Sequence, residues 1–272
     1  MILENKNIQI HSTDPGVFPP SWAAEWGEDR HGLWAAFIYK NIRQVLRWIR
    51  PGCFMMGSPG AEPERDDDEV FHKVVLTRGY WLAETACTQE LWQAVTGENT
   101  SRFKGKQNPV DSVSWDDCAG FLEQLNAICP GLNFRLPKEA EWEYACRSGT
   151  STPFSFGENI TTGQANFDGN YPYGSGPKGE YRNQTVEVKF FPCNPWGLYE
   201  MHGNVWEWCS DWYGDYDPDK GTDPKGPERG EDRVLRGGCW ISFGRDVRSA
   251  CRYRDSPDDR SGFIGLRLAQ GH

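Results

Sequence analysis

The second half of the chain, residues 150–272, is rich in Gly, Asn, Pro and aromatic residues and has almost no helical period. A long irregular segment within one domain is usually functional, unless it is disordered. Disordered segments are poor in aromatic residues, whereas this one contains Trp196, Trp206, Trp208, Trp212 and Trp240. The whole chain has 13 Trp, although only 38% of its residues are hydrophobic. We therefore expect a loop-rich fold that large aromatic side chains hold together.

The first half of the chain predicts strands followed by helices. Residues 33–39 and 45–49 read as strands, and Lys40 and Asn41 between them suit a hairpin. Thr88 and Ser114 belong to the residue types that cap helices, and Pro137 belongs to the type favoured at the first helical position. The expected helices span 89–96, 115–127 and 138–147.

Domain organisation and charge limit the classes of function. No internal repeat or linker is visible, so we expect one domain over residues 1–272, with a polar lead-in over 1–30. The formal net charge of −10 argues against nucleic-acid binding, because phosphate neutralisation needs clustered Lys and Arg. No stretch approaches the ~20 apolar residues of a membrane span. We expect a monomer, and no signal peptide is visible.

The nine Cys residues contain no CxxC pair and no His-rich spacing, which argues against a structural zinc site. An odd number of Cys leaves at least one thiol unpaired. The Cys pattern does not decide the compartment of the protein.

Four sequence segments form a specific set in this order: RLPKEAEWEYACR at 135–147, GLYEMHGNVWEW at 197–208, RVLRGGCW at 233–240 and IGLRLA at 264–269. The set resembles the formylglycine-generating-enzyme (sulfatase-modifying factor) family, and the resemblance extends over roughly residues 48–269. It implies a compact α+β fold with little regular secondary structure. The C-terminal part of that fold is related to the C-type lectin fold.

The resemblance also implies a chemistry that can be compared with this chain. Enzymes of the family oxidise a substrate cysteine with a copper-bound pair of Cys, which lie five residues apart shortly after a Gly-Gly-Ser motif. Here Cys239 replaces the Ser of that motif, and Cys251 lies twelve residues further on. Because two thiolates on Cu(I) must converge, we expect no copper and no enzymatic activity. Cys251 either forms a disulfide with Cys146 or both stay free.

Two structural calcium sites are further implied by the resemblance. The first would use Asn166, the Phe167 carbonyl, Glu180 and the Arg182 carbonyl, and the second Glu200, the Gly203 and Val205 carbonyls and Glu207. Mixed carboxylate and carbonyl oxygens suit a hard cation. Glu180 and Glu200 depart from the family's usual Asp and Asn. The alternative is that the Asn204–Glu207 stretch is a purely structural turn.

Residues 239–263, which we call the interleaved segment, mix Arg residues with chemically unrelated ones. The Arg residues are Arg245, Arg248, Arg252, Arg254 and Arg260. Fifteen other residues of the segment alternate with no period of 2 or 3.6, and we call them the interleaved positions. They are Cys239, Ile241, Ser242, Phe243, Gly244, Asp246, Val247, Cys251, Tyr253, Asp255, Ser256, Asp259, Ser261, Gly262 and Phe263.

Related domains often carry Asn at many such positions. Replacement of only the adenines of an Asn codon can never give Lys, Glu, Gln, Met or Trp, and every interleaved position obeys this rule. The pattern resembles the variable proteins of diversity-generating retroelements, with residues 233–269 as the variable region. The resemblance implies that the Arg residues and Trp240 are scaffold. The interleaved positions would then form a hypervariable binding surface, with Tyr253 and Phe263 as anchor residues.

The leading hypothesis is therefore a non-enzymatic binding protein of receptor or adhesion type, with an unidentified protein or glycan ligand. The first alternative is an active copper-dependent oxidase that acts on a sulfatase cysteine. The others are an accessory module of the same fold with a fixed partner, and an ordinary surface loop in a degenerate family member. The resemblance favours a cell-surface or extracellular location.

Overall fold

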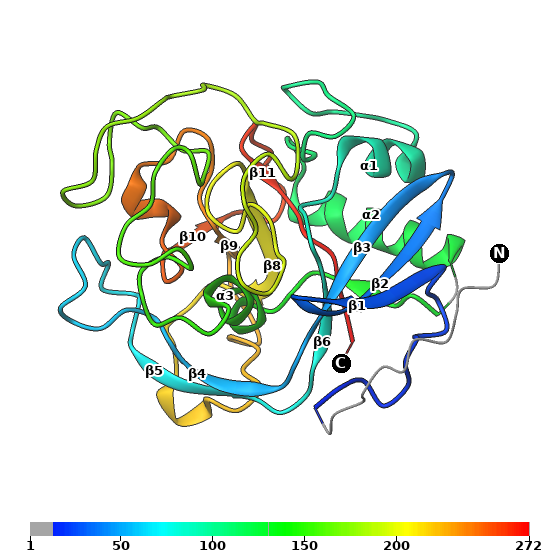
Figure 1. Cartoon of the computed structure of the whole chain (residues 1–272), viewed down its shortest axis with the longest axis horizontal. Helices are drawn as coiled ribbons and strands as arrows, with labels where there is room; N and C mark the ends of the chain where they lie inside the picture. Colours follow the sequence, from blue (N-terminus) through cyan, green and yellow to red (C-terminus); the bar gives the residue numbers. More distant parts are fainter. Residues whose placement is uncertain (1–12, 130, 272) are drawn as a thin grey trace.

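The computed structural model describes residues 13–129 and 131–271 (Figure 1). About 15% of the chain is helix and 24% is strand, which confirms the predicted α+β fold with little regular secondary structure. The strands are β1 (Glu25–Asp29), β2 (Gly32–Tyr39), β3 (Ile42–Ile49), β4 (Gly52–Met56), β5 (His72–Leu76), β6 (Tyr80–Ala83), β7 (Phe134–Arg135), β8 (Trp206–Trp212), β9 (Arg233–Arg236), β10 (Arg252–Asp255), β11 (Ile264–Gly265) and β12 (Ala269–Gln270). The α-helices are α1 (Gln89–Thr96), α2 (Trp115–Ile128) and α3 (Glu139–Arg147), and the 3-10 turns are η1 (Pro218–Lys220) and η2 (Gly244–Val247).

The larger sheet has the strand order β1-β2-β3-β6-β12-β7. The predicted hairpin is confirmed, because β2 and β3 pair antiparallel around Lys40 and Asn41. The φ angles of these two residues are 47° and 66°, as the tightest hairpin turns require. The predicted lead-in over 1–30 includes the strand β1, which pairs with β2. Residues 1–12 of the lead-in lie outside the described residues.

The first two predicted helices are confirmed together with their caps. The Thr88 hydroxyl oxygen accepts a hydrogen bond from the Leu91 N–H at 3.3 Å at the start of α1. Ser114 and Asp117 exchange hydrogen bonds at the start of α2. Both caps occupy backbone N–H groups that the first turn of a helix leaves free.

The third helix begins one residue later than predicted, at Glu139. Lys138 has extended backbone angles and is the N-cap, so Pro137 is not at the first helical position. The Glu141 carboxylate accepts the Lys138 N–H at 2.9 Å. The prediction placed the start one residue too early, because the Glu141 carboxylate in the first turn accepts the N–H of the N-cap residue Lys138. Trp142 and Ala145 face the core, and both are fully buried.

A second sheet has the order β10-β9-β8-β11, with β11 parallel to β8. The interleaved segment leaves the end of β9, passes through η2 and β10, and ends before β11. In Figure 1 its orange ribbon lies beside the green loops that follow α3. The Asp168 N–H donates to the Ser242 carbonyl at 2.9 Å, and the Gly244 N–H donates to the Tyr171 carbonyl at 2.8 Å. These hydrogen bonds join the two loop regions.

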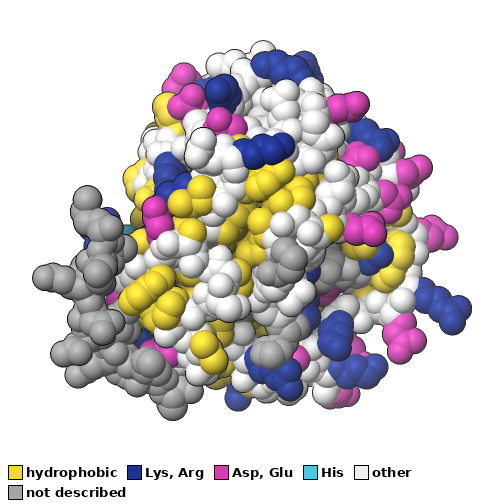
Figure 2. All heavy atoms as spheres, turned by 90° about the vertical axis from the view of Figure 1, so that its right-hand side faces the viewer, with side chains coloured by type: hydrophobic (Ala, Val, Ile, Leu, Met, Phe, Trp, Pro, Cys, Tyr) yellow, Lys and Arg dark blue, Asp and Glu magenta, His cyan; other side chains and the backbone are white. Residues whose placement is uncertain are grey.

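The opposite side of the molecule carries α1, α2 and the β1–β3 strands, and Figure 2 shows hydrophobic side chains gathered on that face. The main core cluster joins these elements, and the half-buried Trp22, Trp26 and Val95 pack against it. No helix in the described part of the chain is long and apolar enough to cross a membrane.

Candidate functional site

The interleaved segment rests on a buried ion pair network. The Arg248 side chain is fully buried, and its guanidinium donates to Glu62 at 2.8 Å and to both carboxylate oxygens of Glu69 at 2.7 Å. It also donates to the carbonyls of Arg245 at 2.9 Å and Glu64 at 3.0 Å. A buried charge that is paired and fully hydrogen-bonded fixes the local backbone, because breaking it leaves an uncompensated charge.

Two arginines in strands of the second sheet, Arg252 of β10 and Arg236 of β9, form another buried ion-pair network that shares Glu139. Arg252 donates to the Glu139 carboxylate at 2.7 and 3.1 Å, and it stacks on the Tyr216 ring at 3.9 Å. Arg236 pairs with Glu143 and donates to the carbonyls of residues 249, 250 and 251. The network therefore binds the backbone of the interleaved segment directly.

The remaining Arg residues of the segment lie at the surface. Arg245 pairs with Asp246 at 3.3 Å, Arg254 with Asp232 at 3.5 Å, and Arg260 with Asp117 at 2.6 Å. Exposed pairs of this kind contribute little to stability. The scaffold role predicted for the Arg residues thus fits the location of Arg248 and Arg252 only.

Three interleaved positions present large side chains to solvent. Ile241, Phe243 and Tyr253 are 45%, 40% and 46% exposed. Phe243 packs against the exposed Tyr171 with ring centroids 4.2 Å apart, and Tyr253 stacks on Trp206 at 5.2 Å. Exposed aromatic and aliphatic side chains on a fixed backbone suit ligand contact. Tyr171 is a neighbour that sequence periodicity could not identify, because it comes from a distant loop.

Five interleaved positions lie inside the protein: Cys239, Ser242, Gly244, Val247 and Cys251. A Cβ atom added at Gly244 would stand 2.4 Å from the Tyr173 backbone nitrogen. The Ser242 hydroxyl accepts the Cys239 N–H at 3.1 Å. Such positions contact a ligand only if the loop moves, so the binding surface expected from the sequence is limited here to the exposed and half-buried members of the set.

The other interleaved positions lie at intermediate depth or at the surface. Asp246, Asp255, Ser256, Ser261, Gly262 and Phe263 are half-buried, whereas Asp259 is exposed. Burial and the neighbouring Asp259 carboxyl raise the pKa of Asp255 to about 6. Phe263, the second predicted anchor residue, packs against the main core cluster and is less available than Tyr253.

The thiols of the segment are poorly suited to metal chemistry. Burial raises the pKa of Cys239 to about 11 and that of Cys251 still further, whereas the thiolate is the metal-binding form. Cys146 and Cys251 are both free, so the disulfide that the sequence left open is not formed. The Cys251 sulfur lies within 4.8 Å of carboxylate oxygens of Asp66 and Glu69, but Arg248 occupies both oxygens of Glu69.

The first calcium site implied by the resemblance fits an oxygen-binding cation. The Asn166 side-chain oxygen is buried without a hydrogen-bond partner, while its amide nitrogen donates to the Gln184 carbonyl at 2.9 Å. The carbonyls of Phe167 and Arg182 accept no hydrogen bond within the described residues. Glu180 is largely exposed and pairs with the Arg182 side chain at 2.9 Å. An unpartnered buried oxygen calls for a ligand or a water.

In the second implied site, Glu207, Glu200 and the Gly203 carbonyl already accept hydrogen bonds. The Glu207 carboxylate accepts hydrogen bonds from Arg267 at 2.8 Å and from the Trp142 indole at 2.7 Å. The Glu200 carboxylate accepts the N–H groups of Lys189 and Phe191, and burial raises its pKa to about 7. The Gly203 carbonyl accepts the Val205 N–H at 3.1 Å. The oxygens of Glu200, Glu207 and Gly203 are thus already taken up by hydrogen bonds within the protein, so we derive no calcium site from them.

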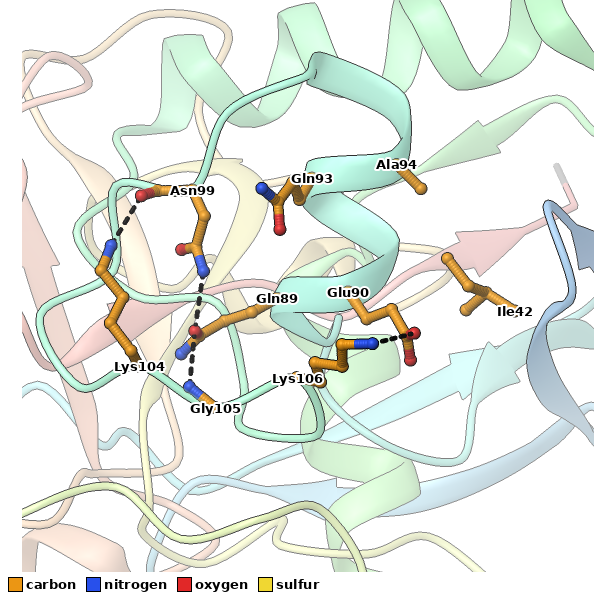
Figure 3. Close-up of a pocket in the computed structure, with 9 residues that line it drawn as sticks. All are labelled: Ile42, Gln89, Glu90, Gln93, Ala94, Asn99, Lys104, Gly105 and Lys106. Carbon is orange, nitrogen blue, oxygen red and sulfur yellow. Dashed lines mark hydrogen bonds and ion pairs between the residues drawn. The ribbon is translucent and has the colours of Figure 1, made fainter.

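A polar cavity of about 500 Å³ lies between α1 and the 99–106 loop (Figure 3). Figure 3 shows the Gln89 side chain joined to Asn99 and Gly105, with hydrogen bonds of 2.9 and 3.1 Å. The Gln89 amide nitrogen also donates to the carbonyls of Phe103 and Pro109. The hydrogen-bonding groups of the Gln89 side chain are therefore all used within the protein.

The sulfatase-modifying factor enzyme 1-like domain model matches residues 40–272, which is most of the chain. The chain belongs to this family. Its expected fold is thereby confirmed, since the match includes every motif quoted from the sequence.

The similar proteins include formylglycine-generating enzymes and serine/threonine-protein kinases. The formylglycine-generating enzyme of Mus musculus is 35% identical over 210 residues, covering 74% of this chain and 54% of the enzyme. The serine/threonine-protein kinase pkn1 of Chlamydia caviae is 39% identical over 171 residues, covering 61% of this chain and 24% of the kinase. The chain thus spans about half the length of the enzyme and about a quarter of the length of the kinase.

Solved structures with the same fold include Treponema denticola variable protein 1. It is 28% identical with a TM-score of 0.73, and the match covers 87% of this chain and 98% of that protein. PvdO from Pseudomonas aeruginosa is 25% identical with a TM-score of 0.72, covering 92% of this chain and 99% of PvdO. The fold is therefore shared with at least one protein described as variable.

Proposed function

We propose that this chain is a ligand-binding protein whose binding face consists of the exposed part of the interleaved segment. One observation carries the proposal: Arg248, Arg252 and Arg236 fix the backbone from inside, while Ile241, Phe243 and Tyr253 stand outside. Surface side chains on such a backbone can change at little cost in stability. This combination suits a site that varies in chemistry while its framework stays constant.

We further propose that a retroelement diversifies residues 233–269. The amino-acid types at the interleaved positions, all of them reachable from an Asn codon by replacing adenines, and the likeness to Treponema denticola variable protein 1 support this. Sequencing the encoding genome tests it. We expect a near-copy of the DNA for residues 233–269 that differs only at adenines, beside a reverse-transcriptase gene. A genome without such a copy would rule out the retroelement.

The buried, protonated thiols of Cys239 and Cys251 support a non-enzymatic role. The 35% identity to the Mus musculus enzyme favours the competing oxidase function, and a direct assay separates the two. The protein is incubated with Cu(I), O₂ and a cysteine-containing sulfatase peptide, and the peptide mass is measured. We expect no change, and a loss of about 18 Da, the mass change on formylglycine formation, would establish the oxidase.

Calcium has a structural role in this proposal. Asn166, Glu180 and the carbonyls of Phe167 and Arg182 would hold the ion, and the unpartnered Asn166 oxygen supports the assignment. The ion would join the two ends of the 166–182 loop, and this loop contacts the interleaved segment through Asp168. Calcium would thus stabilise the border of the binding face.

A further inference from the structure

A cavity of about 520 Å³ borders the interleaved segment at Trp240. Its lining includes Arg102, Phe103 and Lys104 from one loop, and Gln184 and Phe190 from another. The Phe103 ring meets the Trp240 ring edge-on at 5.3 Å, so the cavity adjoins the proposed binding face. Its volume is within the range of about 300–1,000 Å³ that is typical of ligand sites.

Arg102 is an exposed cation without an anionic partner. Its guanidinium lies over the rings of Phe103 and Trp240, 5.1 and 5.6 Å from their centroids. The side chain donates no hydrogen bond and forms no ion pair within the described residues. Most of the other arginines of this acidic chain have a carboxylate partner, so the free guanidinium of Arg102 is an exception. Two aromatic faces orient its planar donors in advance.

The position of Arg102 depends on an interleaved position. A Cβ atom added at Gly262 would lie 2.7 Å from the Arg102 Cδ and 3.1 Å from its Cβ. Any larger residue at 262 must therefore displace the stem of Arg102. Gly262 thus permits the present placement of the guanidinium over Trp240.

The rest of the cavity combines positive charge with apolar surface. Lys104 adds a second cation, and its ammonium donates to the Asn99 carbonyl at 2.6 Å. Glu187 is the single acid of the lining, so the two cations outnumber it. Phe190 is 58% exposed and offers an apolar contact.

We propose that this cavity binds a carboxylate side chain of a polypeptide ligand. An apolar residue next to that side chain in the ligand would pack on Phe190. The inference rests on the proposed function. It adds one chemical feature of the ligand, a carboxylate, which the proposed function does not specify. Arg102 presents the fork of donors that pairs bidentately with a carboxylate. Variation at residue 262 would turn this subsite on or off.

Saturation-transfer NMR and titration with acetyl-Gly-Glu-Phe-amide test the proposal, with acetyl-Gly-Gln-Phe-amide as the uncharged control. We expect the Glu peptide to bind at least tenfold more tightly than the Gln peptide. Arg102→Gln should abolish that difference, Arg102→Lys should retain part of it, and Gly262→Ala should reduce it. Lys106→Gln removes the same charge from an exposed side chain outside this cavity and should leave the difference intact.

Equal binding of both peptides, or an unchanged difference in Arg102→Gln, would overturn the proposal. Binding of glucuronate in place of the Glu peptide would overturn the polypeptide assignment and would assign the carboxylate to a glycan. Thermal unfolding of each variant shows whether it is folded. These outcomes are independent of whether Ile241, Phe243 and Tyr253 bind a ligand, so failure of this inference is distinguishable from failure of the proposed function.

Discussion

Arg248 and Glu69 form a doubly hydrogen-bonded ion pair in which neither side chain is exposed to solvent. Arg248 belongs to the interleaved segment, whereas Glu69 lies in the loop between β4 and β5. The Arg248 guanidinium holds the pKa of Glu69 below its usual value although burial opposes this. The pair thus connects a segment of changing chemistry to a distant part of the chain.

Replacing Arg248 by Met should destabilise the protein by about 3–5 kcal/mol, because Glu62 and Glu69 would be left buried without a counter-charge. Urea unfolding followed by Trp fluorescence measures the change. Arg254→Met is the matched control, since Arg254 is exposed and pairs only at 3.5 Å. The control should change stability by less than about 0.5 kcal/mol. Similar losses in both variants would contradict the scaffold role of Arg248.

Gly244→Ala should be strongly destabilising although Gly244 is an interleaved position. The new Cβ would meet the Tyr173 backbone nitrogen at 2.4 Å, so η2 or its neighbouring loop would have to shift. Tyr253→Ala, at an exposed position of the same segment, should cost about 1 kcal/mol or less. Thermal unfolding compares the two variants. A stable Gly244→Ala variant would show that this position also tolerates diversity.

Calcium should raise the melting temperature if Asn166 and its neighbours hold the ion. A ligand at 100 times its Kd stabilises the folded state by about 2.7 kcal/mol. The measurement compares thermal unfolding in CaCl₂ with unfolding in EDTA. Asn166→Ala should abolish the difference, whereas Glu200→Gln should preserve it. A calcium response that survives in Asn166→Ala but disappears in Glu200→Gln would assign the ion to the second site instead.

Asp255 should make the protein less stable as the pH rises. Burial and the neighbouring Asp259 carboxyl raise its pKa from the usual 3.8 to about 6 in the folded protein, so the folded state binds more protons between these values. Stability therefore falls as the pH increases from about 4 to about 6. Asp255→Asn should raise the melting temperature at pH 7.5 and have no such effect below pH 4.

Asp258→Asn is the control for this titration, because a hydrogen bond from Ser256 lowers the pKa of the exposed Asp258. It should bring no gain in melting temperature at pH 7.5. Equal melting temperatures for Asp255→Asn and the wild-type protein at every pH would show that ionisation of Asp255 beside Asp259 does not destabilise the folded protein.

Local sequence signals predicted the regular elements well. Positive-φ residues at Lys40 and Asn41 and the caps Thr88 and Ser114 act on their immediate neighbours, so their effects could be read from the chain. The start of α3 was misplaced because the Glu141 carboxylate, rather than Pro137, satisfies its first turn. Burial within the interleaved segment could not be predicted, because partners such as Glu69 and Tyr173 are far away in the sequence.

The neighbours of the proposed binding face were likewise invisible in the sequence. Arg102, Tyr171 and Phe190 come from loops without any periodicity, and only the fold brings them towards the interleaved segment. The calcium ligands were proposed from family resemblance alone. The structure then separated a set with an unpartnered oxygen, at Asn166, from a set already occupied by Arg267 and Trp142.

The central claim is that a fixed framework carries an exchangeable binding face, and one library experiment tests it most directly. One displayed library randomises Ile241, Phe243 and Tyr253, and a second randomises Arg236, Arg248 and Arg252. Both are sorted for protease resistance and then for binding to immobilised lysozyme. We expect most members of the first library to stay folded and to yield specific binders, whereas the second library should lose its folded members. A first library that unfolds, or that stays folded but never yields a binder, would contradict it.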